Sequence, residues 1–470
     1  EPLRYDRDVK PLLKERCAYC HGALKQEAGL RLDTASLLKQ GSDSGPIVEP
    51  GKPDVGTLIE RITETDESLR MPPEGAPLKP EEIALLKRWV AEGLPAPEDE
   101  QPEKDPRQHW SFLPVKRPPI PAVVLPGWDA NPIDPFIAQQ LQQHGLQPNP
   151  EADKATLLRR VTIDLIGLPP TQAELHAFIA DDFPNAYDKV VDRLLASPHY
   201  GERWGRHWMD VWRYSDWYGR RSVPDVMNSY PQLWRWREWI VRSLNADKGY
   251  DRMVMEMLAA DEICPTEDEN LVATGFIIRN WFKWNYNSWM KDQVEHTGKA
   301  FLGLTMNCCQ CHDHKYDPLS QQDYFKFRAF FEPLELRHDR VPGEPDPGPF
   351  KKYVYAQSYG PINSGMVRVF DEKLDAQTFL YVKGDERNLI KDKPIPPGIP
   401  SLLESIPFDV QPVTLPPTAH YPGLKPFVRE EELGKLEQNL PAAETAAREA
   451  ETKWNAERAP LDAALAAARE

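Results

Sequence analysis

Two short segments place a pair of thiols and an imidazole at the same spacing. Their residues are Cys17, Cys20 and His21 in the first copy, and Cys308, Cys311 and His312 in the second. A Cys-x-x-Cys-His motif is typical of c-type haem attachment, in which both thiols bond to the porphyrin and the histidine binds the iron. One accidental copy is expected in only about two of every thousand chains of this composition. The sequence therefore predicts two covalently bound haem c groups, each with its iron.

Other chemistry could use the same thiols: a disulfide, a redox-active Cys-x-x-Cys pair or half of a zinc site. A zinc site would need a second Cys-x-x-Cys or a spaced pair of histidines nearby, and neither follows. Cys264 and Cys309 are left over; they could pair in an oxidising compartment, or remain reduced and buried. Covalent haem attachment takes place outside the bacterial inner membrane. We therefore expect a periplasmic or exported protein whose signal peptide has been removed.

Composition narrows the class of protein. The 470 residues are 40% hydrophobic, which is enough for two or three domain cores at about 100–200 residues per domain. The formal net charge of −16 argues against nucleic-acid binding, because phosphates require a basic surface. No apolar run approaches the roughly 18 residues of a membrane span, so we expect no transmembrane segment. The chain begins at Glu1 and is interpreted as mature or trimmed.

Residues 1–95 are predicted to form a class I cytochrome c-like domain for the first haem. A helical pattern leads into Cys17, and a second helix is predicted over 80–92, with Pro80 at its first position and Gly93 at its end. The iron then needs a sixth ligand on the opposite haem face. Met71, the only methionine in the first 200 residues, is the candidate, and Met/His ligation would raise the reduction potential. The alternative is a methionine that fills a gap in the core.

Residues 96–130 are interpreted as a proline-rich linker, and residues 131–334 as a larger helical domain with the second haem. Helices are predicted over 157–165, after a Thr171 capping box, over 186–196 and over 292–308. The aromatic segment 200–218 is interpreted as one wall of the second haem pocket, although a plain buried helix would look similar. Its tryptophans could also stack on a sugar, but packing around a haem is the more common use of such residues.

The second iron also needs an account of its distal face. His314 is only two residues from His312 and lies on the proximal side, whereas His296 would be about 24 Å away along a straight helix, so any protein ligand on the distal face should come from another segment. His207 is the preferred distal ligand, with His199 behind it, and a vacant position would instead imply reactivity. The residues proposed to furnish a catalytic pocket there are His207, Asp210, Tyr214 and Asp216. The loop 314–317 could contact the haem edge or simply face solvent.

The motifs resemble those of the large planctomycete-type cytochrome c proteins. Residues 5–93 look like their N-terminal cytochrome domain, and residues 133–332 look like the helical domain that follows. The second match rests on Leu158-Arg159-Arg160, Asp164-Leu165-Ile166-Gly167-Leu168-Pro169-Pro170, Tyr200-Gly201-Glu202-Arg203-Trp204, His207-Trp208-Met209-Asp210 and the run 301–315. The resemblance implies a further large domain after residue 470, so we interpret the chain as truncated. The family's genomic context suggests breakdown of complex, often sulfated, polysaccharides.

The last third of the chain changes character. Residues 335–427 are predicted to form a small β-subdomain, with strands at 353–355, 366–370 and 378–382. Residues 428–470 carry leucines at helical spacing, interrupted by Pro441 and Pro460, and are predicted to form a helical hairpin or coiled coil. The expected fold class is therefore mainly α: a class I cytochrome c-like domain, a larger helical haem domain, a small β-subdomain and a C-terminal helical hairpin.

The leading functional hypothesis is a periplasmic dihaem c-type cytochrome that transfers electrons as part of an oxidoreductase. Electrons would pass from the second haem to the Met71-ligated first haem, and then to an external acceptor such as another cytochrome. A carbohydrate is the substrate class that the family context suggests. The alternatives are a pure electron-transfer cytochrome without substrate, a dihaem peroxidase, and a structural or binding scaffold.

Overall fold

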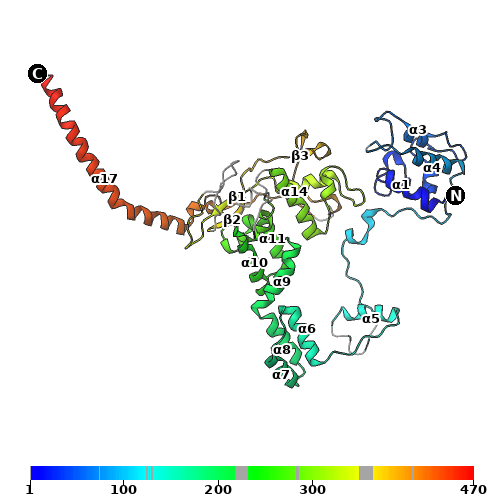
Figure 1. The fold of residues 1–470 in the computed structure, drawn as a ribbon, viewed down its shortest axis with the longest axis horizontal. Coiled ribbons are helices and arrows are strands. Elements are labelled where there is room, and N and C mark those ends of the chain that lie inside the picture. The colour runs from blue at the N-terminus through cyan, green and yellow to red at the C-terminus, as the bar shows by residue number, and fades with distance from the viewer. Residues whose placement is uncertain are drawn as a thin grey trace. The chain divides into compact units, whose positions relative to one another are not determined.

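The computed structural model describes residues 2–73, 75–122, 125, 128, 131–216, 231–281, 285–348, 364–403 and 407–469. These residues are mainly helical, with two small antiparallel sheets (Figure 1), which confirms the predicted fold class. The chain divides into two compact units. The first contains Glu1–Asn149, Thr305–Phe330 and Gln377–Asp409, and the second contains Pro150–Leu304, Phe331–Ala376 and Val410–Glu470. Both Cys-x-x-Cys-His motifs therefore belong to the first unit, although they lie far apart in the sequence.

The N-terminal part of the first unit is a small helical fold. Its elements are a π-helix over Tyr5–Val9, α1 (Lys10–Arg16), α2 (Ala35–Gln40), α3 (Thr57–Thr63) and α4 (Pro80–Ala91). Helix α1 ends at Cys17, as predicted. Pro80 occupies the first turn of α4, and the carboxylate of Glu82 accepts the Lys79 backbone N–H at 2.6 Å, which stabilises the predicted start of this helix.

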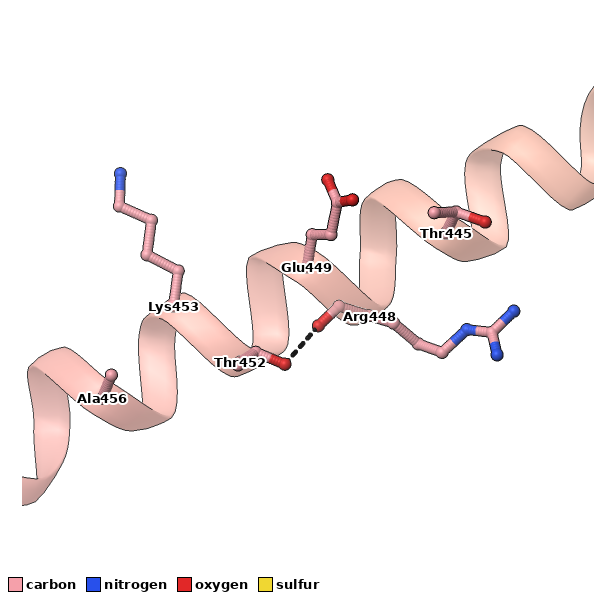
Figure 2. Close-up of a pocket in the computed structure, with 6 residues that line it drawn as sticks. All are labelled: Thr445, Arg448, Glu449, Thr452, Lys453 and Ala456. Carbon is pink, nitrogen blue, oxygen red and sulfur yellow. Dashed lines mark hydrogen bonds between the residues drawn. The ribbon is translucent and has the colours of Figure 1, made fainter.

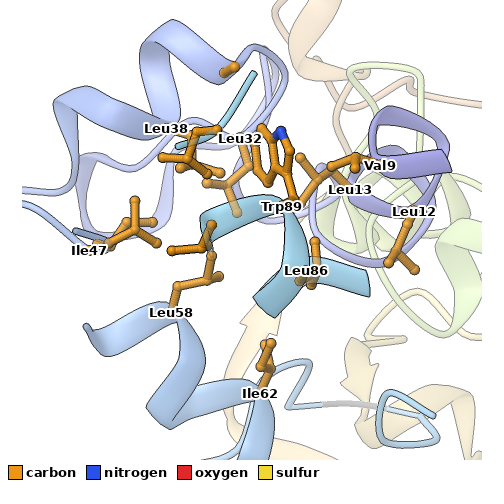
Figure 3. Packing of buried hydrophobic residues seen from close by; sticks show 14 of the residues in the cluster. Val9, Leu12, Leu13, Leu32, Leu38, Ile47, Leu58, Ile62, Leu86 and Trp89 are labelled. Carbon is orange, nitrogen blue, oxygen red and sulfur yellow. The ribbon is translucent and has the colours of Figure 1, made fainter. Parts of the chain in front are cut away.

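One apolar cluster holds these helices together (Figure 3). Trp89 of α4 is completely buried and stacks on Tyr5, with ring centroids 5.5 Å apart. Its indole N–H donates to the Pro95 carbonyl at 2.9 Å, so the polar atom is also satisfied. Figure 3 shows Trp89 beside Leu13 and Val9, with Leu86 on the same helix. Each such buried side chain contributes about 1.5–3 kcal/mol to folding.

The rest of the first unit contains helices α5 (Asp134–Gln143) and α15 (Gln321–Arg328) and a sheet formed by β3 (Thr378–Tyr381) and β4 (Leu389–Ile395). The buried carboxylate of Asp323 caps α15 at Ser320 and accepts the Ser401 N–H at 2.9 Å. Phe325 packs edge-on against Tyr381 of β3, with centroids 4.8 Å apart. These contacts fix the segment that follows the second motif.

The second unit is mainly helical and also contains one two-stranded sheet. Those described are α6 (Lys154–Ile166), α7 (Gln172–Ala180), α8 (Ala186–Leu195), α9 (Pro198–Val211), α10 (Trp234–Asn245), α11 (Tyr250–Ile263), α12 (Asp268–Leu271), α13 (Gly275–Ile278), α14 (Tyr286–Thr297) and α16 (Pro417–His420). The predicted helices over 157–165 and 186–196 and the Thr171 capping box are confirmed. Helix α9 lies directly against α10, because a Cβ on Gly201 would be 2.4 Å from the Val241 carbonyl oxygen.

One sequence prediction in this region needs correction. The helix expected over 292–308 does not reach the second motif: α14 continues as a π-helix to Leu302, and Gly303 ends it with a φ of 65°. That left-handed conformation suits glycine and stops the helical hydrogen bonds. Strands β1 (Leu334–Asp339) and β2 (Met366–Asp371) pair antiparallel, which confirms the strand at 366–370. The strand predicted at 353–355 lies outside the described residues.

Helix α17 (Pro426–Ala467) runs without interruption through both of its prolines (Figure 1). The helical prediction is confirmed. Of the two predicted forms the hairpin is wrong, and the coiled coil remains a prediction. Proline removes one N–H and disfavours a helix interior, yet its fixed φ is compatible with a helix, and the surrounding Ala, Glu and Arg residues favour helix strongly. Among the residues of α17 whose burial is described, Val428 alone is buried. No described helix combines the length and apolar composition needed to cross a membrane.

Candidate functional site

The first motif forms a tight turn at the end of α1. The backbone N–H groups of Cys20 and His21 both donate to the Cys17 carbonyl, at 3.2 and 3.0 Å. A Cβ on Gly22 would lie 2.3 Å from the Ala18 carbonyl oxygen, so this turn has no room for a larger residue. The turn brings two thiols three residues apart into one short loop, and Cys17 packs against the buried apolar cluster.

The thiol chemistry of the first motif favours haem over a redox pair. Burial raises the pKa of the Cys17 thiol to about 12, whereas a redox-active Cys-x-x-Cys needs a lowered pKa. A thioether is neutral and suits an apolar environment. The six cysteines are free in the described structure. Cys264 and Cys309 belong to different units, so the pairing considered for them remains a prediction.

His21 is oriented as a metal ligand would be. Its Nδ1 lies 3.1 Å from the Glu27 carbonyl oxygen, and burial lowers the pKa of its imidazole. A neutral ring that donates Nδ1–H to a carbonyl presents the lone pair of Nε2, which is the atom that binds iron. The Leu32 N–H donates to the His21 carbonyl at 2.7 Å, which fixes the backbone on the other side.

The second motif repeats this arrangement. Asn307–Gln310 form a 3-10 turn, and the N–H groups of Cys311 and His312 donate to the Cys308 carbonyl at 3.1 and 3.3 Å. Nδ1 of His312 lies 2.7 Å from the Asp313 carbonyl oxygen, so Nε2 again remains for a metal. Unlike the first pair, Cys308 and Cys311 are exposed.

A glycine leaves room for the sulfur of Cys311. Gly384 has a φ of 76°, and a Cβ at this position would lie only 2.3 Å from Cys311 Sγ. A cavity of about 420 Å³ lies next to this sulfur, within the usual size range of ligand sites. It is lined by Cys311, His312, Lys383, Glu67, Arg70, Pro73 and Gly75. The thiol of Cys311 and the imidazole of His312 at this cavity are donors that a haem attachment site needs, and Arg70 and Lys383 could neutralise its carboxylates.

Met71 lies on the loop between α3 and α4. Its side chain is 37% exposed and lies outside the buried cluster, which argues against the core-filling alternative. Its N–H donates to the Arg61 carbonyl at 2.8 Å. The guanidinium of Arg16 donates to the carbonyls of Ala76 and Pro77, at 2.7 and 3.0 Å, and so ties the loop to the residue before Cys17. Ligation of iron by Met71 remains a prediction.

The residues expected to furnish a catalytic pocket belong to the second unit and divide into two groups. His207 and Asp210 are exposed on α9, where Asp210 pairs with Arg206 one turn away. Tyr214 donates to Asp216 at 2.8 Å, and burial together with this carboxylate raises the pKa of the tyrosine. The two groups share no hydrogen bond or ion pair among those described.

The neighbouring aromatic residues pack mainly on one another. Trp208 stacks on Trp212 with centroids 5.1 Å apart, and also contacts Tyr250. Trp212 is buried, which makes it a packing residue and not a sugar-stacking surface. His199 is exposed and pairs with Glu202 at 2.7 Å. Trp217 and Tyr218 lie outside the described residues.

The loop after the second motif contains two polar residues, His314 and Asp313, whose contacts the structure defines. Nδ1 of His314 accepts the Asp317 N–H at 2.9 Å, and the His314 N–H donates to the Leu319 carbonyl, so this histidine stabilises its own loop. Sequence analysis missed Asp313, although it directly follows the second motif. Its carboxylate pairs with Lys25 at 2.5 Å, and its carbonyl accepts from Tyr19 at 3.0 Å. No local pattern indicates this contact, because Tyr19 and Asp313 lie 294 residues apart in the sequence.

A surface depression on α17 offers no competing site. Its lining residues all come from one exposed helix: Thr445, Arg448, Glu449, Thr452, Lys453 and Ala456. Figure 2 shows these side chains leaving the helix in different directions, with one bond, from the Thr452 hydroxyl to the Arg448 carbonyl at 2.8 Å. Without an opposite wall, such a surface cannot enclose a ligand.

Comparison with protein families agrees with this geometry. Residues 17–75 match the family described as Planctomycete cytochrome C, and residues 132–335 match a family described as a protein of unknown function (DUF1549). No curated protein and no solved structure matches the chain. The resemblance inferred from the motifs is confirmed. The first match supports a c-type cytochrome with covalently bound haem c that functions in electron transfer.

Proposed function

Because the chain combines the two regions of a planctomycete-type cytochrome c protein, we propose that it is an exported dihaem c-type cytochrome that serves as the electron-transfer part of an oxidoreductase. One observation carries the proposal. The two Cys-x-x-Cys-His motifs adopt the same backbone turn, each histidine directs Nδ1 at a backbone carbonyl, and both belong to one compact unit. Because the two motifs have the same local geometry, we infer that each of them binds a haem.

Each haem, when bound, would supply a one-electron Fe(III)/Fe(II) couple. Cys17 and Cys20 would hold the first group, and Cys308 and Cys311 would hold the second. Their histidines would bind iron through Nε2, while the Nδ1–H bonds to carbonyls would orient the rings and set their basicity. Arg70 and Lys383 at the second cavity would neutralise carboxylates.

The proposed path runs from the second haem to the first and then to an external acceptor. Met71 as the sixth ligand would give the first iron a high potential, which suits an exit site. His207 is the proposed distal ligand of the second iron. Asp210, Tyr214 and Asp216 would face the substrate, for which the family context suggests a carbohydrate.

The dihaem state is tested by intact mass after expression with a cytochrome c maturation system. We expect two haem masses in the parent chain, and one in each of two variants, Cys17→Ala with Cys20→Ala and Cys308→Ala with Cys311→Ala. If the second variant keeps the same mass gain as the parent chain, the second motif holds no haem and the proposal is wrong.

Ligation by His207 is tested by absorption of the oxidised parent chain and of His207→Ala. We expect His207→Ala to convert one haem from low spin to high spin. An unchanged spectrum would remove His207 as a ligand. The oxidoreductase part is tested by adding candidate carbohydrates to the oxidised parent chain and following haem reduction by absorption. We expect reduction of the haems; no reduction by any of them would leave a pure electron-transfer cytochrome instead.

A further inference from the structure

A network of contacts connects the two motifs through Asp313. Tyr19 lies between Cys17 and Cys20, and its hydroxyl donates to the Asp313 carbonyl oxygen at 3.0 Å. The same oxygen lies 2.7 Å from Nδ1 of His312. One carbonyl therefore accepts both from the first motif and from the histidine of the second.

The position of Asp313 is determined from several sides. One carboxylate oxygen accepts from the Lys25 ammonium at 2.5 Å, and the other accepts from the Gln321 N–H at 2.8 Å. Lys25 also lies 5.0 Å from the centre of the Tyr19 ring. The rings of Tyr19 and His312 meet edge to face, with centroids 6.4 Å apart and planes at 80°. The carbonyl is thus held where both donors reach it.

The strength of the hydrogen bond at Nδ1 of an imidazole influences the reduction potential of an iron bound at its Nε2. A strong acceptor at Nδ1–H makes the ring more basic, and a more basic ligand stabilises Fe(III) and lowers the reduction potential. A carbonyl oxygen that already accepts a hydrogen bond from a hydroxyl group is a weaker acceptor for a second donor. Tyrosine at neutral pH carries its proton and can donate it.

We propose that Tyr19 of the first motif is a positioning residue that raises the reduction potential of the haem iron bound by His312, by sharing the Asp313 carbonyl. This inference rests on the proposed dihaem function and adds a regulatory link to it. The segment that binds one haem would set the electron affinity of the other. Electron flow toward the second site would then depend on correct assembly of the first motif.

The test is Tyr19→Phe, which keeps the ring and removes the hydroxyl. Redox titration followed by haem absorption should show one of two midpoint potentials shifted to a lower value and the other unchanged. Tyr316→Phe is the matched control, because Tyr316 is an exposed tyrosine in the loop that follows Asp313. It should leave both potentials unchanged. Haem absorbance and circular dichroism of each variant establish that it is folded and loaded.

The shift in reduction potential must also be assigned to the iron bound by His312. In the variant with Cys308→Ala and Cys311→Ala, which retains only the first haem, Tyr19→Phe should have no effect on the potential. A shift in that single-haem protein, unchanged potentials in the dihaem protein, or a shift to higher potential would each overturn the inference. A parent chain with one haem mass would instead overturn the dihaem function, so the two failures are distinguishable.

Discussion

The two Cys-x-x-Cys-His motifs have the same local geometry in different surroundings. The first adjoins an apolar core in which Trp89 and Leu86 are fully buried, and Cys17 packs against that core. The second has exposed cysteines and a cavity lined by charged side chains, among them Lys383 and Arg70. A motif therefore determines how a haem can be attached, whereas the surrounding fold determines its polarity, and through it the reduction potential.

The largest expected difference between the two sites is structural. Loss of the first haem, by Cys17→Ala with Cys20→Ala, should lower the melting temperature of the first unit strongly, because that haem would complete the apolar core. Loss of the second, by Cys308→Ala with Cys311→Ala, should lower it less. Thermal unfolding followed by circular dichroism measures both. Equal effects would mean that the two surroundings do not differ in the way described.

The apolar core of the first site can be tested separately. Leu86→Ala should lower the free energy of unfolding by about 2–5 kcal/mol, because it opens a cavity at a fully buried position. Leu69→Ala, at a position 45% exposed, should change it by no more than about 0.5 kcal/mol. Urea denaturation compares the two variants. A small effect of Leu86→Ala would show that the core around the first motif is loosely packed.

At the second site, Gly384 lies directly beside the sulfur of Cys311. Gly384→Ala should lower stability by about 1–3 kcal/mol through its positive φ, and should also reduce haem loading at Cys311. Gly343→Ala is the control, since it has a similar φ of 77° but open space around its Cβ. Haem content by intact mass should fall for Gly384→Ala and not for the control. Equal loading in both would exclude a steric role for Gly384.

The smallest expected effect concerns the ion pair between the motifs. Lys25→Met should lower stability by about 0–1 kcal/mol, since both side chains are about one-third exposed and such pairs are weak. Salt should reduce the difference from the parent chain. Lys52→Met, which removes a more exposed pair with Glu49, provides the comparison. A loss well above 1 kcal/mol for Lys25→Met would mean that the pair organises the second site.

Several parts of the structure were predictable because they depend on neighbours in sequence. The start of α4 follows from Pro80 and Glu82, and the capping box at Thr171 follows from Glu174. Both attachment turns follow from their three-residue spacing. The interruption after Leu302 was missed because Gly303 was not recognised as a helix end, although its residue type carried that signal.

The residues of the motifs alone determined the chemistry of haem attachment, since two thiols and an imidazole at that spacing lie within a single backbone turn. Tertiary structure alone decided that Tyr19 meets Asp313, 294 residues later, and that Gly384 adjoins Cys311. Periodicity and capping report on residues within a few positions of each other. Contacts across hundreds of residues depend on which surfaces of the folded chain pack together, and no local pattern specifies that choice.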